Sequence, residues 1–184
     1  MSSKDSYYDW LKEEMGSLID SLDLPDMSRK FLRSRWLDQV LWMEKKSASA
    51  QKWYYLLRLI AIIGGVTIPA LVSLNISDGP VSAYIRWTTF GLSLLVAISV
   101  AVEGFFNYGE RWRHYRRTVE GLKREGWQFF QLSGPYRSCQ NHAEAYPVFA
   151  GRMENMFQQE VEVYVTEVVK EMKKGEGEKG NRVL

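Results

Sequence analysis

One carboxylate in the sequence stands where a charge is costly, at the end of a long apolar segment. Residues 87–102 carry no charge, and Glu103 follows them directly. Because successive residues of an α-helix are rotated by about 100°, Glu103 would share a helix face with two hydroxyl side chains and two leucines. Ion paths through membranes combine such polar groups with apolar constrictions. The candidate pore-lining or ion-site residues are Thr88, Leu92, Leu95, Ser99 and Glu103.

Three interpretations of Glu103 are open. In a helical hairpin, Arg58 of the preceding apolar segment would lie at an equivalent depth, so Arg58 and Glu103 could form a structural ion pair that offsets the cost of both charges. Glu103 could instead attract cations at the mouth of a pore. It could also be a solvated carboxylate at the membrane interface.

Two uncharged runs, residues 59–77 and 87–102, would position these side chains. With their flanking residues each approaches the 20 or so residues that a membrane-spanning helix needs. Interfacial aromatic residues bracket the runs, as is typical of membrane spans: Trp53, Tyr54, Tyr55, Trp87 and Tyr108. We predict an all-α protein with a two-span transmembrane hairpin over residues 54–108. A buried hairpin in a soluble protein is the alternative, which the aromatic brackets and the charge distribution disfavour.

Basic residues are distributed unequally around the predicted hairpin. Lysines and arginines are dense before the first span and after the second, whereas the connecting segment holds only Arg86. The positive-inside rule therefore places both termini in the cytoplasm, and we expect a multi-pass protein of the bacterial inner membrane. The arginines that follow the second span are expected to contact anionic lipid headgroups rather than nucleic acid: Arg111, Arg113, Arg116 and Arg117.

The remaining segments predict cytoplasmic helices. We expect an amphipathic helix over residues 1–24, a helix leading into the membrane over 25–53, a helical hairpin over 109–172 and a disordered tail over 173–184. Apolar residues recur at spacings of three and four along these helices, ending in a coiled-coil-like seam that includes Val161 and Val165. One helix cannot bury such a stripe alone, so we expect a helical bundle and a homo-oligomer.

Nothing in the sequence predicts an enzyme or a cofactor. The two histidines, His114 and His142, have no cysteine or carboxylate partners at metal-ligand spacing. The glycines of "GEGEKG" match a dinucleotide fingerprint only literally, because no strand precedes them and only four residues follow. We therefore expect no cofactor and no metal, with the lipid bilayer, ions and further copies of the chain as partners.

Several stretches resemble one known family. They are "RWLDQVLW" before the first span, Ile68-Pro69 inside it, "WRHYRRTVEGLKRE" after the second, "GPY" at residues 134–136, and a late Phe149, Glu154 and Glu160. Together they are similar to a bacterial domain of unknown function grouped with the two-transmembrane SLATT proteins. The resemblance covers roughly residues 30 to 170 and implies a membrane effector that forms pores. SLATT relatives are often encoded beside nucleotide-sensing domains, and we expect no such domain fused to this chain.

Two classes of function follow. The polar face that ends at Glu103 favours an ion-conducting or pore-forming homo-oligomer. The large share of predicted cytoplasmic helix favours a non-conducting, membrane-anchored scaffold that binds protein partners or anionic lipid.

Overall fold

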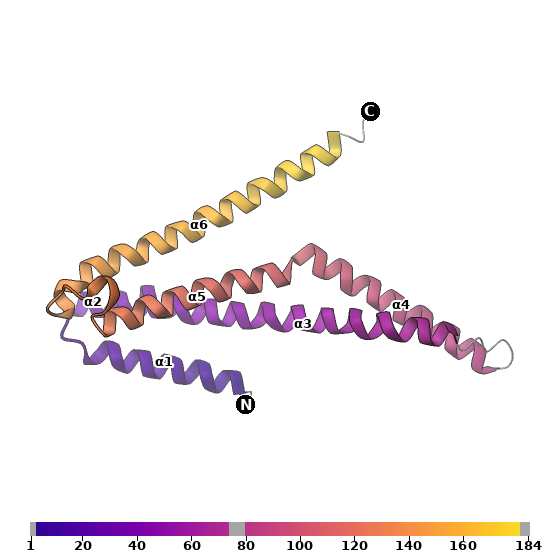
Figure 1. Cartoon of the computed structure of the whole chain (residues 1–184), viewed down its shortest axis with the longest axis horizontal. Coiled ribbons are helices and arrows are strands. Elements are labelled where there is room, and N and C mark those ends of the chain that lie inside the picture. Colours follow the sequence, from indigo (N-terminus) through magenta and orange to yellow (C-terminus); the bar gives the residue numbers. More distant parts are fainter. Residues whose placement is uncertain (1–2, 74–79, 181–184) are drawn as a thin grey trace. The chain divides into compact units, whose positions relative to one another are not determined.

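The computed structural model of the chain is all-α, which confirms that part of the predicted fold class (Figure 1). It describes residues 3–73 and 80–180, with side chains from 7 to 73 and from 81 to 162. The chain divides into two compact units. We call Met1–Asp38 with Leu122–Leu184 the terminal unit, and Gln39–Gly121 the hairpin unit. In chain order the elements are α1 (Ser3–Ser21), α2 (Asp26–Phe31), the π-helical turn η1 (Leu32–Leu37), α3 (Asp38–Ser73), α4 (Pro80–Phe106), α5 (Tyr108–Phe130), the 3-10 turn η2 (Gly134–Tyr136) and α6 (His142–Gly180).

Prolines and helix propensity explain where several helices begin and end. α2 begins directly after Pro25, whose extended backbone ends the preceding segment, as the sequence predicts. The predicted turn at Asp78-Gly79 lies outside the described residues, and α4 begins at Pro80. α6 continues through Gly180, past Met172, where the sequence predicts the start of a disordered tail. Helix propensity is divided in this stretch, because its lysines and glutamates favour a helix and its three glycines oppose one.

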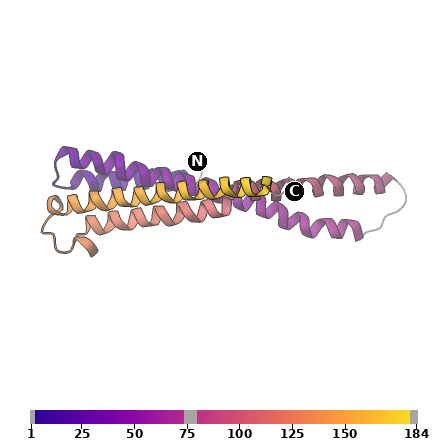
Figure 2. The same cartoon turned by 90° about the horizontal axis from the view of Figure 1, so that it is seen from above.

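The core of the terminal unit is built from the apolar stripes of its helices. α1, α2 with η1, the end of α5 and the first turns of α6 lie side by side (Figure 2). The stripe of α1 buries Leu11, Met15 and Ile19, and leaves Leu18 half-buried. The other large side chains that are fully buried in this unit are Leu32, Trp36, Leu122, Phe129, Tyr136, Phe149 and Met153.

Trp36 lies at the centre of this core. Its indole Nε1 donates a hydrogen bond of 3.1 Å to the backbone carbonyl of Leu122, and its ring meets those of Phe130 and Phe149 edge to face. α5 comes close enough to Trp36 only because residue 126 is glycine. A Cβ atom there would lie 2.1 Å from Cζ2 of the indole. Trp36 therefore joins η1, α5 and α6.

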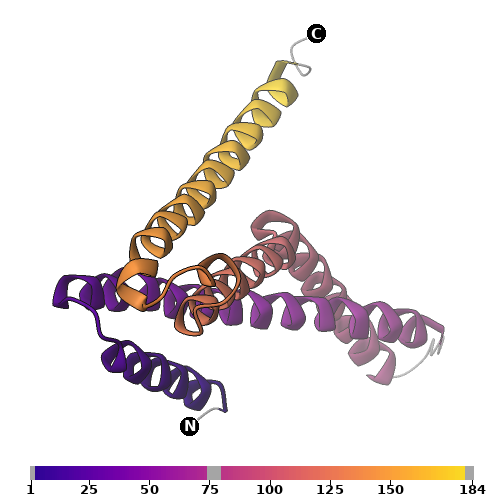
Figure 3. The ribbon, with the colours of Figure 1, turned by 60° about the vertical axis from the view of Figure 1, so that its left-hand side comes forward.

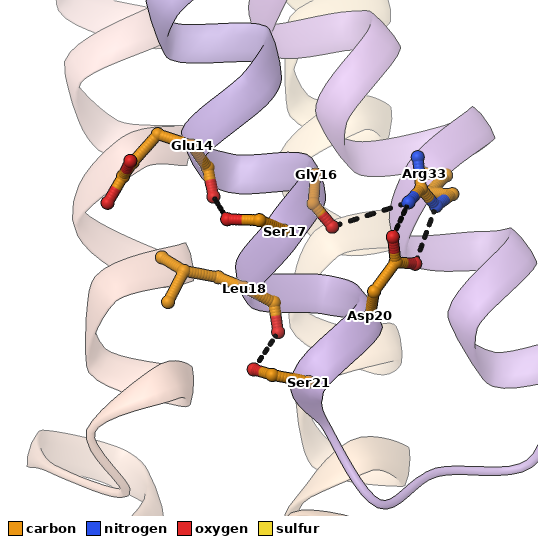
Figure 4. A network of polar contacts seen from close by, with 7 residues as sticks. All are labelled: Glu14, Gly16, Ser17, Leu18, Asp20, Ser21 and Arg33. Atoms are coloured by element: carbon orange, nitrogen blue, oxygen red, sulfur yellow. Dashed lines mark hydrogen bonds and ion pairs between the residues drawn. The ribbon is translucent and has the colours of Figure 1, made fainter.

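The side chains of η1 connect it to the helices on either side. Arg33 donates to both carboxylate oxygens of Asp20 and to the carbonyl of Gly16 on α1, as Figure 4 shows. Arg35 makes a two-point ion pair with Glu154 of α6, with both N–O distances at 2.9 Å. This pairing with the Arg35 guanidinium lowers the pKa of Glu154. η1 thus anchors α1 through one arginine and α6 through another.

A second polar network fastens the end of α5 to α6. The Glu125 carboxylate is buried, and it accepts hydrogen bonds from the Tyr136 hydroxyl and from two nitrogens of Arg152. Burial alone would raise the pKa of Glu125, but the hydrogen bonds from Arg152 and Tyr136 hold it below its ordinary value. Burial and the adjacent carboxylate raise the pKa of Tyr136. Glu125 is therefore charged, and Tyr136 protonated, at neutral pH.

We predict that acid weakens the terminal unit through Glu125. Because its folded pKa lies below the unfolded value of about 4.3, the unfolded state binds more protons, and stability is lost as pH falls through the folded pKa. Glu125→Gln should lower the free energy of unfolding at pH 7 by about 1–3 kcal/mol and flatten this acid dependence. Unfolding by urea at pH 7, 5 and 3 measures both effects. If the stability of Glu125→Gln falls with pH as steeply as that of the wild type, the acid dependence arises from other carboxylates.

α6 extends beyond the core that its first turns complete (Figure 3). Phe149, Met153 and Phe157 are buried one above another, and Val161, one turn further, is 61% exposed. Val165 lies among the residues whose side chains are not described. Among the side chains that the structure describes, the predicted seam is therefore buried within the terminal unit as far as Phe157 and exposed at Val161.

Candidate membrane hairpin and its polar face

α3 and α4 are long and apolar enough to cross a membrane, by length and composition. In their most apolar stretches only 11% and 6% of the residues are buried. A core helix of a soluble protein would show the opposite pattern. The exposed side chains are large: Leu59, Ile62, Ile63, Val66, Val72, Val81, Tyr84, Trp87, Phe90, Leu94, Leu95, Ile98 and Val100 are each at least 48% exposed.

A glycine sets the closest approach of α3 to α4. Gly64 is buried, and a Cβ atom built on it would lie 2.1 Å from Cγ2 of Val96 and 3.9 Å from Cδ1 of Leu92. Gly65, the next residue of α3, has nothing within 4 Å of its Cβ position. The same holds for Gly104 of α4. Gly64 is thus the contact within the hairpin.

The structure divides the predicted polar face of α4. Ser99 is only 3% exposed, and its hydroxyl donates a 2.8 Å hydrogen bond to the carbonyl of Leu95 in its own helix. Leu92 is half-buried beside Gly64, whereas Leu95 is 48% exposed and Thr88 is also exposed. The stripe therefore runs along the border between the surface that packs on α3 and the open surface of α4.

Glu103 lies one turn before the end of α4, and Arg58 lies within α3, between its aromatic residues and Gly64. Glu103 is half-buried and Arg58 is exposed. Their depths in the hairpin correspond, since Gly64 contacts Val96 on one side of them and Trp53 stacks on Tyr108 on the other. The structure gives no ion pair between these two described residues. Their pairing stays a prediction.

Asn107 separates α4 from α5. Its φ of 49° is in the left-handed region, where asparagine is among the better-tolerated residues. Its N–H donates to the carbonyl of Glu103 at 2.8 Å, and its own carbonyl accepts from the N–H groups of Glu110 and Arg111. The chain bends here, and a new helix begins at Tyr108 (Figure 1). The bend lies at the predicted end of the second span.

Aromatic side chains meet on both sides of this bend. Tyr108 stacks on Trp53 at 6.3 Å and on Phe106 at 5.3 Å between ring centroids. Trp112 lies 6.0 Å from Tyr54 and 5.5 Å from Tyr55. We call these six residues the aromatic collar. The sequence places these aromatics at the ends of the spans, and the structure shows that they contact one another.

Of the four arginines predicted to contact lipid, one is ion-paired with protein carboxylates and three are not among the described residues' ion pairs. Arg116 makes ion pairs with Glu44 of α3, at 3.2 Å, and with Glu120, at 2.8 Å. The second pair has the helical spacing that the sequence predicts. Arg111, Arg113 and Arg117 are exposed, and none of them makes an ion pair with another described residue.

Among the described side chains, those of residues 7–73 and 81–162, no three histidine, cysteine, aspartate or glutamate groups gather as a metal site would require. The two histidines are in different surroundings. His114 lies beside Tyr115 in the hairpin unit. Nε2 of His142 lies 3.1 Å from the carbonyl of Phe130, and its ring contacts Phe129.

The chain matches a family model over residues 38–144, more than half of its length. The match runs from the first residue of α3 to the first turn of α6. It includes both apolar helices, the aromatic collar, and Glu125 and Tyr136, whereas Arg152 lies beyond it. No curated protein and no solved structure matches the chain. The protein therefore belongs to the family of proteins of unknown function described as DUF4231.

Proposed function

We propose that this protein is a two-span protein of the bacterial inner membrane that assembles as a homo-oligomer and conducts ions. The observation that carries the proposal is the exposure of the apolar side chains of α3 and α4. Soluble monomers rarely expose contiguous apolar patches larger than a few hundred Å². A bilayer removes that surface from water, and helices satisfy their own backbone hydrogen bonds there.

The dimensions of the hairpin fit a bilayer. The apolar part of α4, Val81–Phe106, has 26 residues, and at 1.5 Å per residue it is about 39 Å long. The hydrocarbon core is about 30 Å thick, so the helix reaches both interfaces. The aromatic collar would lie at the interface where the basic residues gather. On the positive-inside rule this side is the cytoplasm, and both termini lie there.

Conduction requires several copies, because two helices cannot enclose a water path. Leu95 and Thr88 are exposed on α4 and available to a neighbouring copy, and Glu103 lies one turn before the bend. Leucines around an axis could form a constriction that closes by dewetting, with a ring of carboxylates below it to attract cations. The resemblance to pore-forming SLATT proteins supports this role by analogy only.

We expect Leu95→Ser to raise the resting cation leak of vesicles that contain the purified protein. Leu94→Ser is the matched control, because Leu94 is adjacent and similarly exposed, at 51% against 48% for Leu95, but points about 100° away. Equal leaks from the two variants, or no leak above empty vesicles from any form, would contradict a constriction at Leu95.

Glu103→Gln distinguishes an ion-attracting role of this carboxylate from an ion pair with Arg58, when cation flux and stability are both measured. As an ion-attracting group, its loss should lower cation flux and leave the oligomer intact. As the partner of Arg58, its loss should destabilise the fold, and Arg58→Gln added to Glu103→Gln should restore part of that stability. Unchanged flux with unchanged stability would contradict both roles and leave a carboxylate at the headgroups.

The second candidate function is a non-conducting, membrane-anchored scaffold. The position of Ser99 favours it, because a buried hydroxyl bonded to its own helix leaves the face of α4 less polar than the sequence suggests. Under this function the part of α6 beyond Phe157, where Val161 is 61% exposed, would bind a partner. A protein that is oligomeric in detergent but gives no flux would favour the scaffold. We propose no catalytic activity and no nucleic-acid binding for either function.

A further inference from the structure

Near the aromatic collar, three arginines of α5 make no ion pair with the residues that the structure describes. The guanidinium of Arg116 is occupied by Glu44 and Glu120. Those of Arg111, Arg113 and Arg117 are exposed and make no ion pair within the described part of the chain. Such groups remain available to an external anion.

Two of these arginines share one face of α5. Arg113 and Arg117 are four residues apart, so their side chains project from neighbouring turns on the same side. Arg113 lies level with the collar. A Cβ atom on buried Gly109 would be 2.8 Å from the ring of Tyr54 and 3.6 Å from Nη1 of Arg113. The absent side chain of Gly109 therefore lets α5 pack on Tyr54 with the Arg113 guanidinium close by.

The charge around this pair is positive. Glu110, one turn before Arg113, is an exposed carboxylate on the same helix, and Glu120, three residues after Arg117, is held by Arg116. Against Glu110 stand the three exposed arginines Arg111, Arg113 and Arg117. At the depth of Glu103, exposed Arg58 of α3 offsets that carboxylate. An anion near Arg113 and Arg117 thus meets a net excess of positive charge.

We infer that Arg113 and Arg117, beside Tyr54 of the aromatic collar, form a binding site for the phosphate of anionic phospholipids in the cytoplasmic leaflet. The inference rests on the proposed membrane insertion. Guanidinium groups match phosphate oxygens in charge and in hydrogen-bond geometry. Interfacial aromatic rings fix a helix end at the level of the headgroups. A zwitterionic headgroup carries its own cation, so the site prefers phosphatidylglycerol to phosphatidylcholine.

The test uses the full chain in phosphatidylcholine vesicles, with spin-labelled phosphatidylglycerol or spin-labelled phosphatidylcholine as the probe. Electron paramagnetic resonance gives the fraction of each lipid held at the protein, and hence their relative association constant. We expect the wild type to prefer phosphatidylglycerol. Arg113→Gln with Arg117→Gln should reduce that preference by about two- to fivefold per arginine. The control, Arg124→Gln with Arg137→Gln, removes the same charge from exposed arginines of the terminal unit and should keep the preference.

Three results would overturn the inference. A preference that survives in Arg113→Gln with Arg117→Gln would show that these arginines do not hold the lipid. An equal loss of lipid preference in the control variant would show that the preference depends on the net charge of the protein and not on these two arginines. Inorganic phosphate that abolishes the preference, when chloride of equal ionic strength does not, would make the site one for free phosphate. Flotation of the same vesicles separates the two proposals: a chain that does not float with lipid contradicts membrane insertion as well, whereas one that floats without lipid preference contradicts only this site.

Discussion

Trp36→Ala is expected to unfold the terminal unit more readily than any other single truncation. The indole is 1% exposed, contacts two aromatic rings and donates a hydrogen bond to the carbonyl of Leu122. Truncating a buried tryptophan costs about 3–5 kcal/mol through lost burial and the cavity that remains. Each loss of about 1.4 kcal/mol of stability raises the population of the open form about tenfold. Hydrogen exchange in the segments around Leu32 and Phe149 should therefore accelerate by about two to three orders of magnitude.

Trp36→Phe is the control for this experiment. It keeps most of the aromatic packing and removes the indole N–H, so we expect a smaller loss, of about 1 kcal/mol. Gly126→Ala approaches the same site from the other side, because its Cβ atom would lie 2.1 Å from the indole. It should cost about 1–3 kcal/mol, and Trp36→Phe should partly relieve that cost. Equal exchange rates in Trp36→Ala and the wild type would contradict the central position of Trp36.

Gly64→Ala is expected to loosen the hairpin, whereas Gly65→Ala should not. The added methyl group at 64 would lie 2.1 Å from Cγ2 of Val96. A valine in a helix has essentially one χ1 rotamer, so the helices must separate rather than the side chain rotate. We expect a loss of about 1–3 kcal/mol in the hairpin of the protein in detergent. At 65 the methyl group meets nothing within 4 Å, and alanine favours the helix.

A second substitution, at Val96, tests whether the loss in Gly64→Ala comes from this contact. Val96→Ala removes the atom that the new methyl group meets, so Gly64→Ala with Val96→Ala should be more stable than the sum of the two separate losses implies. Thermal unfolding in detergent, followed by circular dichroism, measures each variant. If Gly64→Ala and Gly65→Ala lose equal stability, the contact between α3 and α4 lies elsewhere.

Local patterns in the sequence were enough to predict much of the helical structure. The spacing of Leu32, Trp36, Val40 and Met43 predicts a buried stripe, and all four are buried. The spacing of Phe149, Met153 and Phe157 does the same for α6. These patterns succeed because one helix turn fixes which side chains share a face.

Features that depend on distant segments could not be predicted in this way. The hydrogen bond from Trp36 joins residues 86 positions apart, and the pair of Glu125 with Arg152 spans a loop. Gly64 and Gly65 are indistinguishable by composition, and only the rotation of α3 against α4 decides which one lies at the contact. The same rotation turns Ser99 inward and leaves Leu95 exposed. The π-helical turn at Leu32–Leu37 has no signal in the sequence that we can identify.

Chemical labelling of two cysteines tests the central claim, that the hairpin spans a membrane with both termini on the cytoplasmic side. The native Cys139 is half-buried in the terminal unit, and Ser82→Cys places a second thiol in the first turn of α4. In intact bacterial spheroplasts, a membrane-impermeant maleimide should label Ser82→Cys in a Cys139→Ser background. It should label the native Cys139 only after the membrane is permeabilised. Labelling of Cys139 in intact spheroplasts, or of Ser82→Cys only after permeabilisation, would contradict the account.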